Sequence, residues 1–330
     1  MTKSIEEDKP SVRFFEVDKD DEDIRLDRWL RRRLPDIKYG QLAKWLRTGQ
    51  IRVDGHRAKP GQRLTQGQSV RLPPIKSQPP HSHTFKNIGN SYKTNSVDTK
   101  NLRNMILFCD KSLLALNKPS GLAVQGGSKT FKHLDGMLDV LRFTALERPR
   151  LVHRLDKDTS GVLLLARNSN AASNLIAQFR EQSMTKNYWA LVVGVPFPSS
   201  GIIELPLLKS AGQGGEKMRP SPELGKKATT HYSIVSNAGQ SISWLKLTPK
   251  TGRTHQLRAH CKALGTPIVG DGKYGGKEAY IEGLPKKLHL HARSIAFIHP
   301  ITGKRIEIIA PLKSQCLESW NMLDFDTSVA

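Results

Sequence analysis

Cysteine is scarce in this sequence. Its 330 residues include three cysteines, Cys109, Cys261 and Cys316, and no two of them form a C-x-x-C pair. An odd number of widely spaced cysteines argues against a disulfide framework and against a zinc knuckle. Long apolar runs are absent as well, since none approaches the roughly 18 residues that a transmembrane helix needs. We therefore expect a globular protein that neither crosses a membrane nor depends on disulfide bonds.

Common targeting and cofactor motifs are also missing. The first ten residues, MTKSIEEDKP, lack the basic and apolar segments of a signal peptide and are too acidic for a transit peptide. The sequence contains no P-loop, no G-x-G-x-x-G after a predicted strand and no convincing cluster of metal ligands. We therefore expect a cytoplasmic protein that uses no cofactor and no metal ion.

Acidic residues are in the minority. The chain has 52 Lys and Arg residues against 30 Asp and Glu, which gives a formal net charge of +22 at pH 7, and its isoelectric point is near 10.0. Such an excess of positive charge favours a polyanionic partner. Nucleic acid is the first interpretation. A membrane surface or an acidic protein is the alternative, and neither has a supporting motif in the sequence.

The composition along the chain indicates two domains. A chain of 330 residues has room for two domains of ~100–200 residues each. Residues 76–103 contain few aliphatic side chains and cannot form a core, and we interpret His81 and His83 within them as solvated. The expected division is a mobile tail (1–20), a small first domain (21–75), a linker (76–103), a large second domain (104–320) and a C-terminal tail (321–330).

The first domain combines helical periodicity with many basic residues. Apolar residues recur at helical spacing over 24–34, and Pro35 predicts the end of that helix. A second helix is predicted over 41–47, and strands over 50–55 and 68–73. The basic residues are either a phosphate-binding surface or an ordinary solvated face. They are Arg25, Arg28, Arg31, Arg32, Arg33, Lys44, Arg47 and Arg52.

The second domain mixes strand and helix patterns irregularly. Apolar runs predict strands over 105–109, 113–116, 161–167 and 188–194, and a helical pattern covers 170–182. These elements do not alternate regularly as in βαβ winding, so the pattern indicates an α+β fold.

The segment HRLDKDTSG, residues 153–161, places five ionisable residues directly before a buried strand. One interpretation is a turn in which Asp158, Thr159 and Ser160 bond to local amides. A metal site built from His153, Asp156 and Asp158 is a second, although one short loop gives poor ligand geometry. The third is a catalytic carboxylate whose negative charge is held by a nearby cation.

A second charged segment offers such a cation. Arg253, His255, Arg258 and His260 fall within eight residues, and a glycine-rich stretch follows them. This segment is either a basic surface helix or a place where guanidinium groups approach a phosphate or a carboxylate.

Taken together, these motifs resemble two known families. RLDRWLRRRLP and WLRTGQIRVDGHRAKPGQRLTQGQSVRL resemble the S-four-type RNA-binding domain. HRLDKDTSG, NKPSGLAVQGG, KNYWALVVG, TGRTHQLRAHCKALGTPIVGDGKYG and LHLHARSIAFIHP follow the order seen in the RluA family of pseudouridine synthases. The resemblance implies an α+β catalytic domain with a mixed, mostly antiparallel sheet flanked by helices. A small α/β RNA-binding domain precedes it.

The resemblance also implies an activity and its residues. The enzyme would isomerise specific uridines of large-subunit (23S) ribosomal RNA to pseudouridine after flipping the base out of its helix, and would act as a monomer without a cofactor. Asp156 would be the catalytic carboxylate, Arg253 its basic partner and Tyr188 the aromatic residue against the base. Arg154 would hold the flipped uridine, and 159–161 would shape the turn. The alternatives are a noncatalytic RNA-binding or ribosome-assembly factor and an RNA hydrolase.

Overall fold

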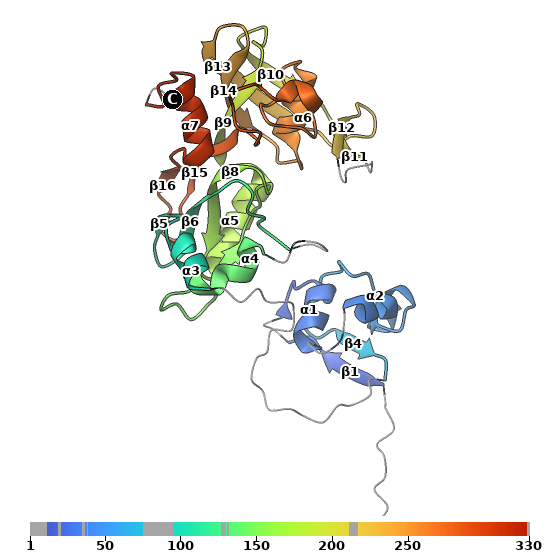
Figure 1. Cartoon of the computed structure of the whole chain (residues 1–330). Coiled ribbons are helices and arrows are strands. Elements are labelled where there is room, and N and C mark those ends of the chain that lie inside the picture. Colours follow the sequence, from blue (N-terminus) through green and yellow to red (C-terminus); the bar gives the residue numbers. More distant parts are fainter. Residues whose placement is uncertain are drawn as a thin grey trace, which may run out of the picture. The chain divides into compact units, whose positions relative to one another are not determined.

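A computed structural model describes residues 12–18, 21–34, 37, 39–74, 95–126, 130, 132–210 and 217–328. The chain divides into two compact units, Met1–Ser91 and Tyr92–Ala330 (Figure 1). His81 and His83, Pro35, and most of the expected linker lie outside the described residues, as does most of the expected N-terminal tail. Each unit is considered below by itself.

The first unit packs two helices against a small antiparallel sheet. The strand order is β1-β4-β2-β3, and all pairs are antiparallel. Its elements are β1 (Arg13–Glu16), α1 (Leu26–Arg33), α2 (Tyr39–Arg47), β2 (Arg52–Val53), β3 (His56–Arg57) and β4 (Ser69–Leu72). The two predicted helices and two predicted strands are confirmed, whereas β1 lies within the range expected to be a tail.

Helix α1 forms because its apolar residues fall on one face. Leu26, Trp29 and Leu30 are fully buried at i, i+3 and i+4, and the indole Nε1 of Trp29 donates to Oδ2 of Asp21 at 2.7 Å. The arginines of α1 lie on its exposed face.

The second unit is built on one 10-stranded mixed sheet. Its central order is β10-β13-β14-β9-β15-β8-β6-β5, with β16 paired to β15 and β7 to β8. The strands are β5 (Ile106–Cys109), β6 (Leu113–Lys118), β7 (Arg150–Leu151), β8 (Ser160–Ala166), β9 (Thr185–Val193), β10 (Ser200–Glu204), β13 (Thr229–Ala238), β14 (Ile242–Pro249), β15 (Leu290–Ile298) and β16 (Arg305–Ile309). A separate hairpin consists of β11 (Leu207–Ser210) and β12 (Lys217–Pro220).

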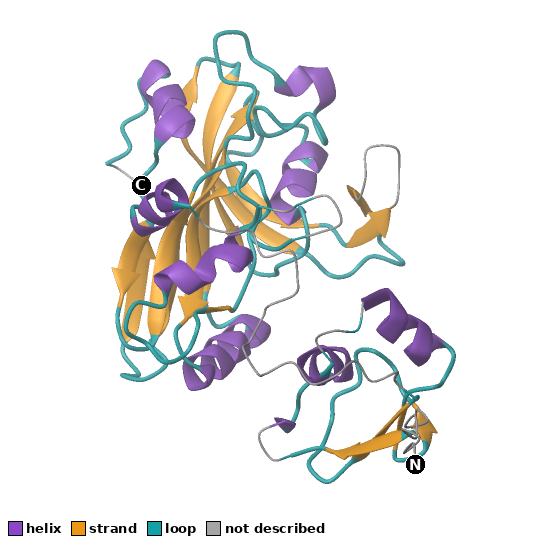
Figure 2. Cartoon of the chain, turned by 60° about the horizontal axis from the view of Figure 1, so that its bottom comes forward, coloured by secondary structure: helices purple, strands orange, loops and turns teal. Residues whose placement is uncertain are grey.

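Helices cover both faces of this sheet (Figure 2). On β6 and β8, one face packs against α5 and the other against α3, α4 and η2. On β9 and β14, α6 covers one face and α7 the other. The helices are α3 (Ser96–Arg103), α4 (Leu134–Met137), η2 (Leu138–Leu141), α5 (Ser169–Glu181), α6 (Gln256–Ala263), η3 (Gly276–Ala279) and α7 (Ser314–Met322). The expected mixed, mostly antiparallel sheet flanked by helices is confirmed, as are the four predicted strands and the predicted helix over 170–182.

The ends of this unit differ from the expected division. Helix α3 lies within the range expected to be linker, and its Leu102 is buried in the core under η2. At the other end, Phe325 packs on Trp244 with 5.8 Å between ring centroids. Residues 321–328 therefore contribute to the core, because burial of Phe325 fixes the chain there. Among the described helices, none is both long and apolar enough to cross a membrane.

The sheet contains one parallel pairing, between β8 and β15, where Gly161 lies opposite Ala292. Gly161 has a φ of +107°, which L side chains rarely adopt. A Cβ atom there would collide with the backbone carbonyl of Ala292. Glycine is thus required for β8 to approach β15 directly after the charged segment.

We expect Gly161→Ala to destabilise the second unit by roughly 2–5 kcal/mol, because it adds both backbone strain and a steric clash. Gly239→Ala is the matched control, since Gly239 also has a positive φ, +59°, but no described atom lies within 4 Å of a Cβ built there. It should cost roughly 1–2 kcal/mol. Chemical denaturation measures both. Equal losses for the two variants would show that the contact with Ala292 is unimportant.

Candidate active site

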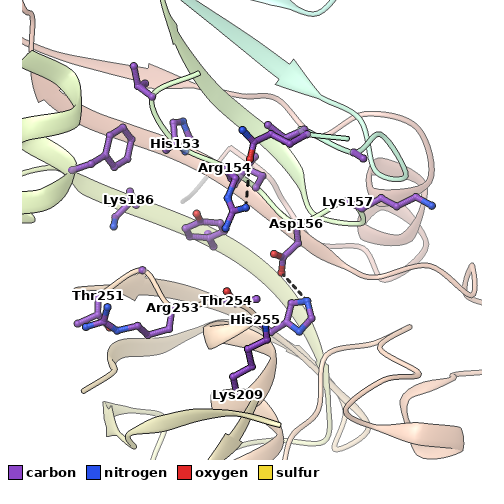
Figure 3. Close-up of a pocket in the computed structure, with 18 of the residues that line it drawn as sticks. His153, Arg154, Asp156, Lys157, Lys186, Lys209, Thr251, Arg253, Thr254 and His255 are labelled. Atoms are coloured by element: carbon purple, nitrogen blue, oxygen red, sulfur yellow. Dashed lines mark hydrogen bonds and ion pairs between the residues drawn. The ribbon is translucent and has the colours of Figure 1, made fainter. Parts of the chain in front are cut away.

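A cavity of about 1030 Å³ opens beside the loop that leads into β8 (Figure 3). Its walls come from this loop, the start of β9, the end of α5 and the loop before α6. Polar and charged groups dominate its lining, and they include Gln125, His153, Arg154, Asp156, Lys157, Arg180, Gln182, Lys186, Tyr188, Lys209, Arg253, His255 and Lys273. Both charged segments of the sequence therefore meet in one site.

Asp156 begins a tight turn that the NKPSG segment holds in place. The amide of Thr159 donates to the Asp156 carbonyl at 3.2 Å, which closes the turn. From the other segment, the Gly121 amide donates to the Lys157 carbonyl at 2.9 Å, and Ser120 Oγ donates to the Asp158 carbonyl at 2.8 Å. The backbone carbonyls of the turn thus accept hydrogen bonds from the Ser120 side chain and the Gly121 amide, nearly forty residues away.

Lys118 is the central residue of this attachment. Its side chain is completely buried, and Nζ donates to the carbonyls of Pro119, Leu122 and Lys157, each at 2.9 Å. Burial lowers the pKa of Lys118 to about 7, although the carboxylates of Asp158 and Asp156 raise it. One ammonium therefore ties two loops together next to Asp156.

His153 has a structural contact that excludes it as a metal ligand through Nε2. The amide of Leu164 donates to this atom at 2.8 Å, and the ring stacks on Phe179 at a centroid distance of 4.5 Å. Burial, assisted by the charge of Lys186, lowers the pKa of His153 to about 3, so the ring is neutral. Among the described residues, no group of three His, Cys, Asp or Glu side chains could hold a metal ion. The metal interpretation of the charged segment is therefore dropped.

Tyr188 and Asp156 line the same part of the cavity, including a side pocket of about 120 Å³. Burial, reinforced by the negative charge of Asp156, raises the pKa of Tyr188. The phenol is therefore neutral at physiological pH. A neutral aromatic ring beside a carboxylate suits a site that binds an uncharged base.

The His255 imidazole lies close to the Asp156 carboxylate. Nε2 lies 3.9 Å from Oδ2 of Asp156, and Nδ1 lies 3.1 Å from the hydroxyl of Tyr274. The same hydroxyl accepts from the Met218 amide at 2.8 Å. Burial lowers the pKa of His255, although Asp156 opposes the shift. A neutral imidazole therefore faces the carboxylate.

Arg253 was expected to be the basic partner of Asp156, but its side chain has other partners in the structure. Arg253 is exposed, its Nε donates to the Lys227 carbonyl at 3.0 Å, and Figure 3 shows its side chain directed along the wall away from Asp156. Arg253 lies in the loop before α6 and lines the cavity. Its described hydrogen bonds go to Lys227 and to Gln256.

Arg258, on the buried face of α6, lines the side pocket with Asp156 and Tyr188, as do the more exposed Arg154, Lys186 and Arg253. It makes a bidentate ion pair with buried Asp271, with Nε to Oδ2 at 2.8 Å and Nη2 to Oδ1 at 2.7 Å. Burial disfavours its charge, but Asp271 and the more distant Asp156 outweigh burial and raise its pKa. The sequence did not distinguish Arg258 from the other basic residues of its segment. Its burial on α6 is the feature that distinguishes it.

Comparisons with known proteins identify the family of this chain. The family model for RNA pseudouridylate synthases matches residues 112–263. The ribosomal large subunit pseudouridine synthase C of Vibrio parahaemolyticus is 36% identical over 324 residues, which cover 94% of this chain and 96% of that protein. The protein of the same name from Pasteurella multocida is 38% identical and covers 92% and 91%. The chain belongs to the family of RNA pseudouridylate synthases.

A solved structure extends the agreement to the fold of this synthase. The structure titled Human RNA Pseudouridylate Synthase Domain Containing 4 is 30% identical, with a TM-score of 0.59, and the match covers 70% of this chain and 97% of that one. The S4 domain model matches residues 24–70. This synthase therefore carries an N-terminal S4 domain, and its enzymatic class is that of an isomerase.

The basic residues predicted to bind RNA are all exposed, but their partners differ. Within the S4 domain, the Arg25 guanidinium pairs with Asp27 at 2.6 Å and that of Arg32 with Asp21 at 2.9 Å. In the second unit, Arg154 is exposed at the cavity, and its Nη1 lies 3.4 Å from Oε1 of Gln125. The remaining predicted residues are also exposed, namely Arg28, Arg31, Arg33, Lys44, Arg47 and Arg52.

Lys118→Met should lower the free energy of unfolding by about 2 kcal/mol, because three partly buried backbone carbonyls lose their donor. It should also lower kcat in the fraction that folds, since the turn that carries Asp156 is released. Denaturation and single-turnover kinetics measure the two effects. Lys111→Met, at an exposed position between β5 and β6, serves as the control. An unchanged unfolding midpoint for Lys118→Met would mean that these hydrogen bonds do not stabilise the turn.

Proposed function

We propose that this synthase converts specific uridines of large-subunit ribosomal RNA into pseudouridine. The observation that carries the proposal is the meeting of Asp156, Tyr188 and Arg258 around one pocket. The printed names of the relatives supply the substrate class. We also propose that the protein acts as a monomer.

The reaction exchanges one glycosidic bond for another. The N1–C1′ bond breaks, the uracil rotates, C5 bonds to C1′, the proton on C5 is lost and N1 gains a proton. The net change involves no redox step. Asp156 acts on the ribose, either by attack at C1′ or by removal of a ribose proton, and both routes need an ionised carboxylate. Arg258 and Lys118 both interact electrostatically with Asp156.

Tyr188 provides a surface for the base. The target uracil must leave its stack before the ribose can be reached, and a neutral aromatic ring replaces part of the stacking that is lost. Arg154, exposed at the cavity, is placed to occupy the space that the flipped base leaves. The basic face of the S4 domain supplies phosphate contacts, which position the RNA without reading its sequence.

Asp156→Asn should abolish pseudouridine formation while leaving RNA affinity nearly unchanged, because the amide keeps the shape of the side chain and loses its charge. Carbodiimide-stop mapping of treated ribosomal RNA measures the product. Asp158→Asn, in the same turn with its side chain exposed, is the control and should lose far less activity. If Asp156→Asn retained activity within about tenfold of wild type, which corresponds to ~1.4 kcal/mol of barrier, Asp156 would not be the catalytic carboxylate. RNA cleavage, or no product from the wild type, would reject the isomerase proposal itself.

Substitutions at Arg258 and at Arg253 should have different effects, the first on kcat and the second on RNA binding. Arg258→Lys keeps a positive charge but loses the bidentate pair with Asp271, so kcat at saturating RNA should fall by orders of magnitude. Arg253→Leu should weaken RNA binding and flatten its salt dependence by roughly 0.7 per lost phosphate contact, with kcat retained. The reverse pattern, with kcat lost in a folded Arg253→Leu, would restore Arg253 as the partner of Asp156.

A further inference from the structure

Lys186 is the residue of the K-x-Y segment to which the proposed mechanism gives no role. It lies on β9 two residues before Tyr188, and the side chains of both line the cavity. The intervening Asn187 points to the other side of the sheet, where it bonds to Ser294 and Thr248. Residues two apart on one strand face are ~6.7 Å apart. Lys186 therefore lines the cavity next to Tyr188.

The ammonium of Lys186 is largely shielded from solvent. Among the described residues, no hydrogen bond or ion pair joins Nζ to another group. Its neighbour His153 is neutral and stacked on Phe179, and the carboxylate that lines the same side pocket is that of Asp156. Burial alone lowers the pKa of Lys186. An anion entering here would offset the cost of burying the charge.

The cavity has room for more than the target nucleotide. Sites of about 300–1,000 Å³ hold a whole drug-sized ligand, and this cavity reaches about 1030 Å³. In Figure 3, Lys186 and His153 lie to one side of Arg154, whereas Asp156 and His255 lie to the other. Ribose and uracil are neutral at pH 7, so the anion that an RNA brings to Lys186 is a backbone phosphate.

We propose that Lys186 binds the backbone phosphate of a nucleotide that flanks the target uridine, which makes the cavity a site for at least two nucleotides. The inference rests on the proposed function insofar as the ligand is RNA. A phosphate clamped beside the flipped nucleotide holds the chain on one side while Asp156 acts on the ribose. Lys186 is thus a binding residue that sets the position of the strand.

The test is a scan with neutral methylphosphonate linkages. A stem-loop of large-subunit ribosomal RNA that crosslinks to the protein is made with one such linkage at a time around the crosslinked uridine, and binding to wild type, Lys186→Met and Lys186→Arg is measured. Wild type should lose roughly tenfold or more in affinity at one linkage. Lys186→Met should bind the unmodified RNA correspondingly more weakly and lose nothing further at that linkage, while Lys186→Arg should bind between the two.

Controls separate this subsite from folding and from catalysis. Lys111→Met should bind as wild type does, and Lys186→Met should unfold no more easily than wild type, because it removes a poorly solvated charge. Equal losses of affinity for wild type and Lys186→Met at every linkage would overturn the subsite, whether or not pseudouridine forms. Coupling at one linkage without any pseudouridine in wild-type reactions would overturn the proposed function and leave the phosphate subsite standing.

Discussion

The position of the candidate active site depends on the contact between Gly161 in β8 and Ala292 in β15. This parallel pairing joins the β5-β6-β8 part of the sheet to the part that contains β9, β14 and β13. Asp156 precedes the contact by five residues, and Tyr188 lies opposite Ala292 on the other side of β15. A side chain at position 161 would force the two parts of the sheet apart, and the carboxylate and the aromatic ring would separate with them.

A second constraint is the electrostatic balance around Asp156. The neighbouring histidines are neutral, because burial lowers the pKa of both His153 and His255, and the buried arginine is already paired with Asp271. The Asp156 carboxylate therefore interacts with the charge of Arg258, whereas the direct salt bridge of Arg258 is with Asp271. A partly solvated carboxylate of this kind remains accessible to a ribose, whereas a carboxylate in a bidentate pair such as that of Asp271 is fully occupied.

The large positive charge of the chain is distributed between two tasks. In the S4 domain the exposed arginines of α1 suit long-range attraction and phosphate contacts, which are sensitive to salt. In the second unit the cations at the cavity wall occupy defined positions, and the buried Lys118 ammonium donates to three backbone carbonyls. Net charge alone cannot distinguish these tasks, because Lys118, Lys186 and Arg28 contribute equally to it.

The sequence by itself determined the α+β class and most strand and helix positions, and its motifs pointed to Asp156 and Tyr188 as the residues now proposed for the site, because apolar periodicity and contiguous motifs are local properties. Tertiary structure decided the rest. Arg253 and Arg258 stand in the same short segment and both line the pocket of Asp156, and only the burial of one face of α6 shows that Arg258 is the buried one. The role of Lys118 depends on carbonyls up to 39 residues away, and Phe325 became part of the core through a contact with Trp244. Such contacts join residues distant in the chain, and no local pattern of residue types encodes which distant groups will meet.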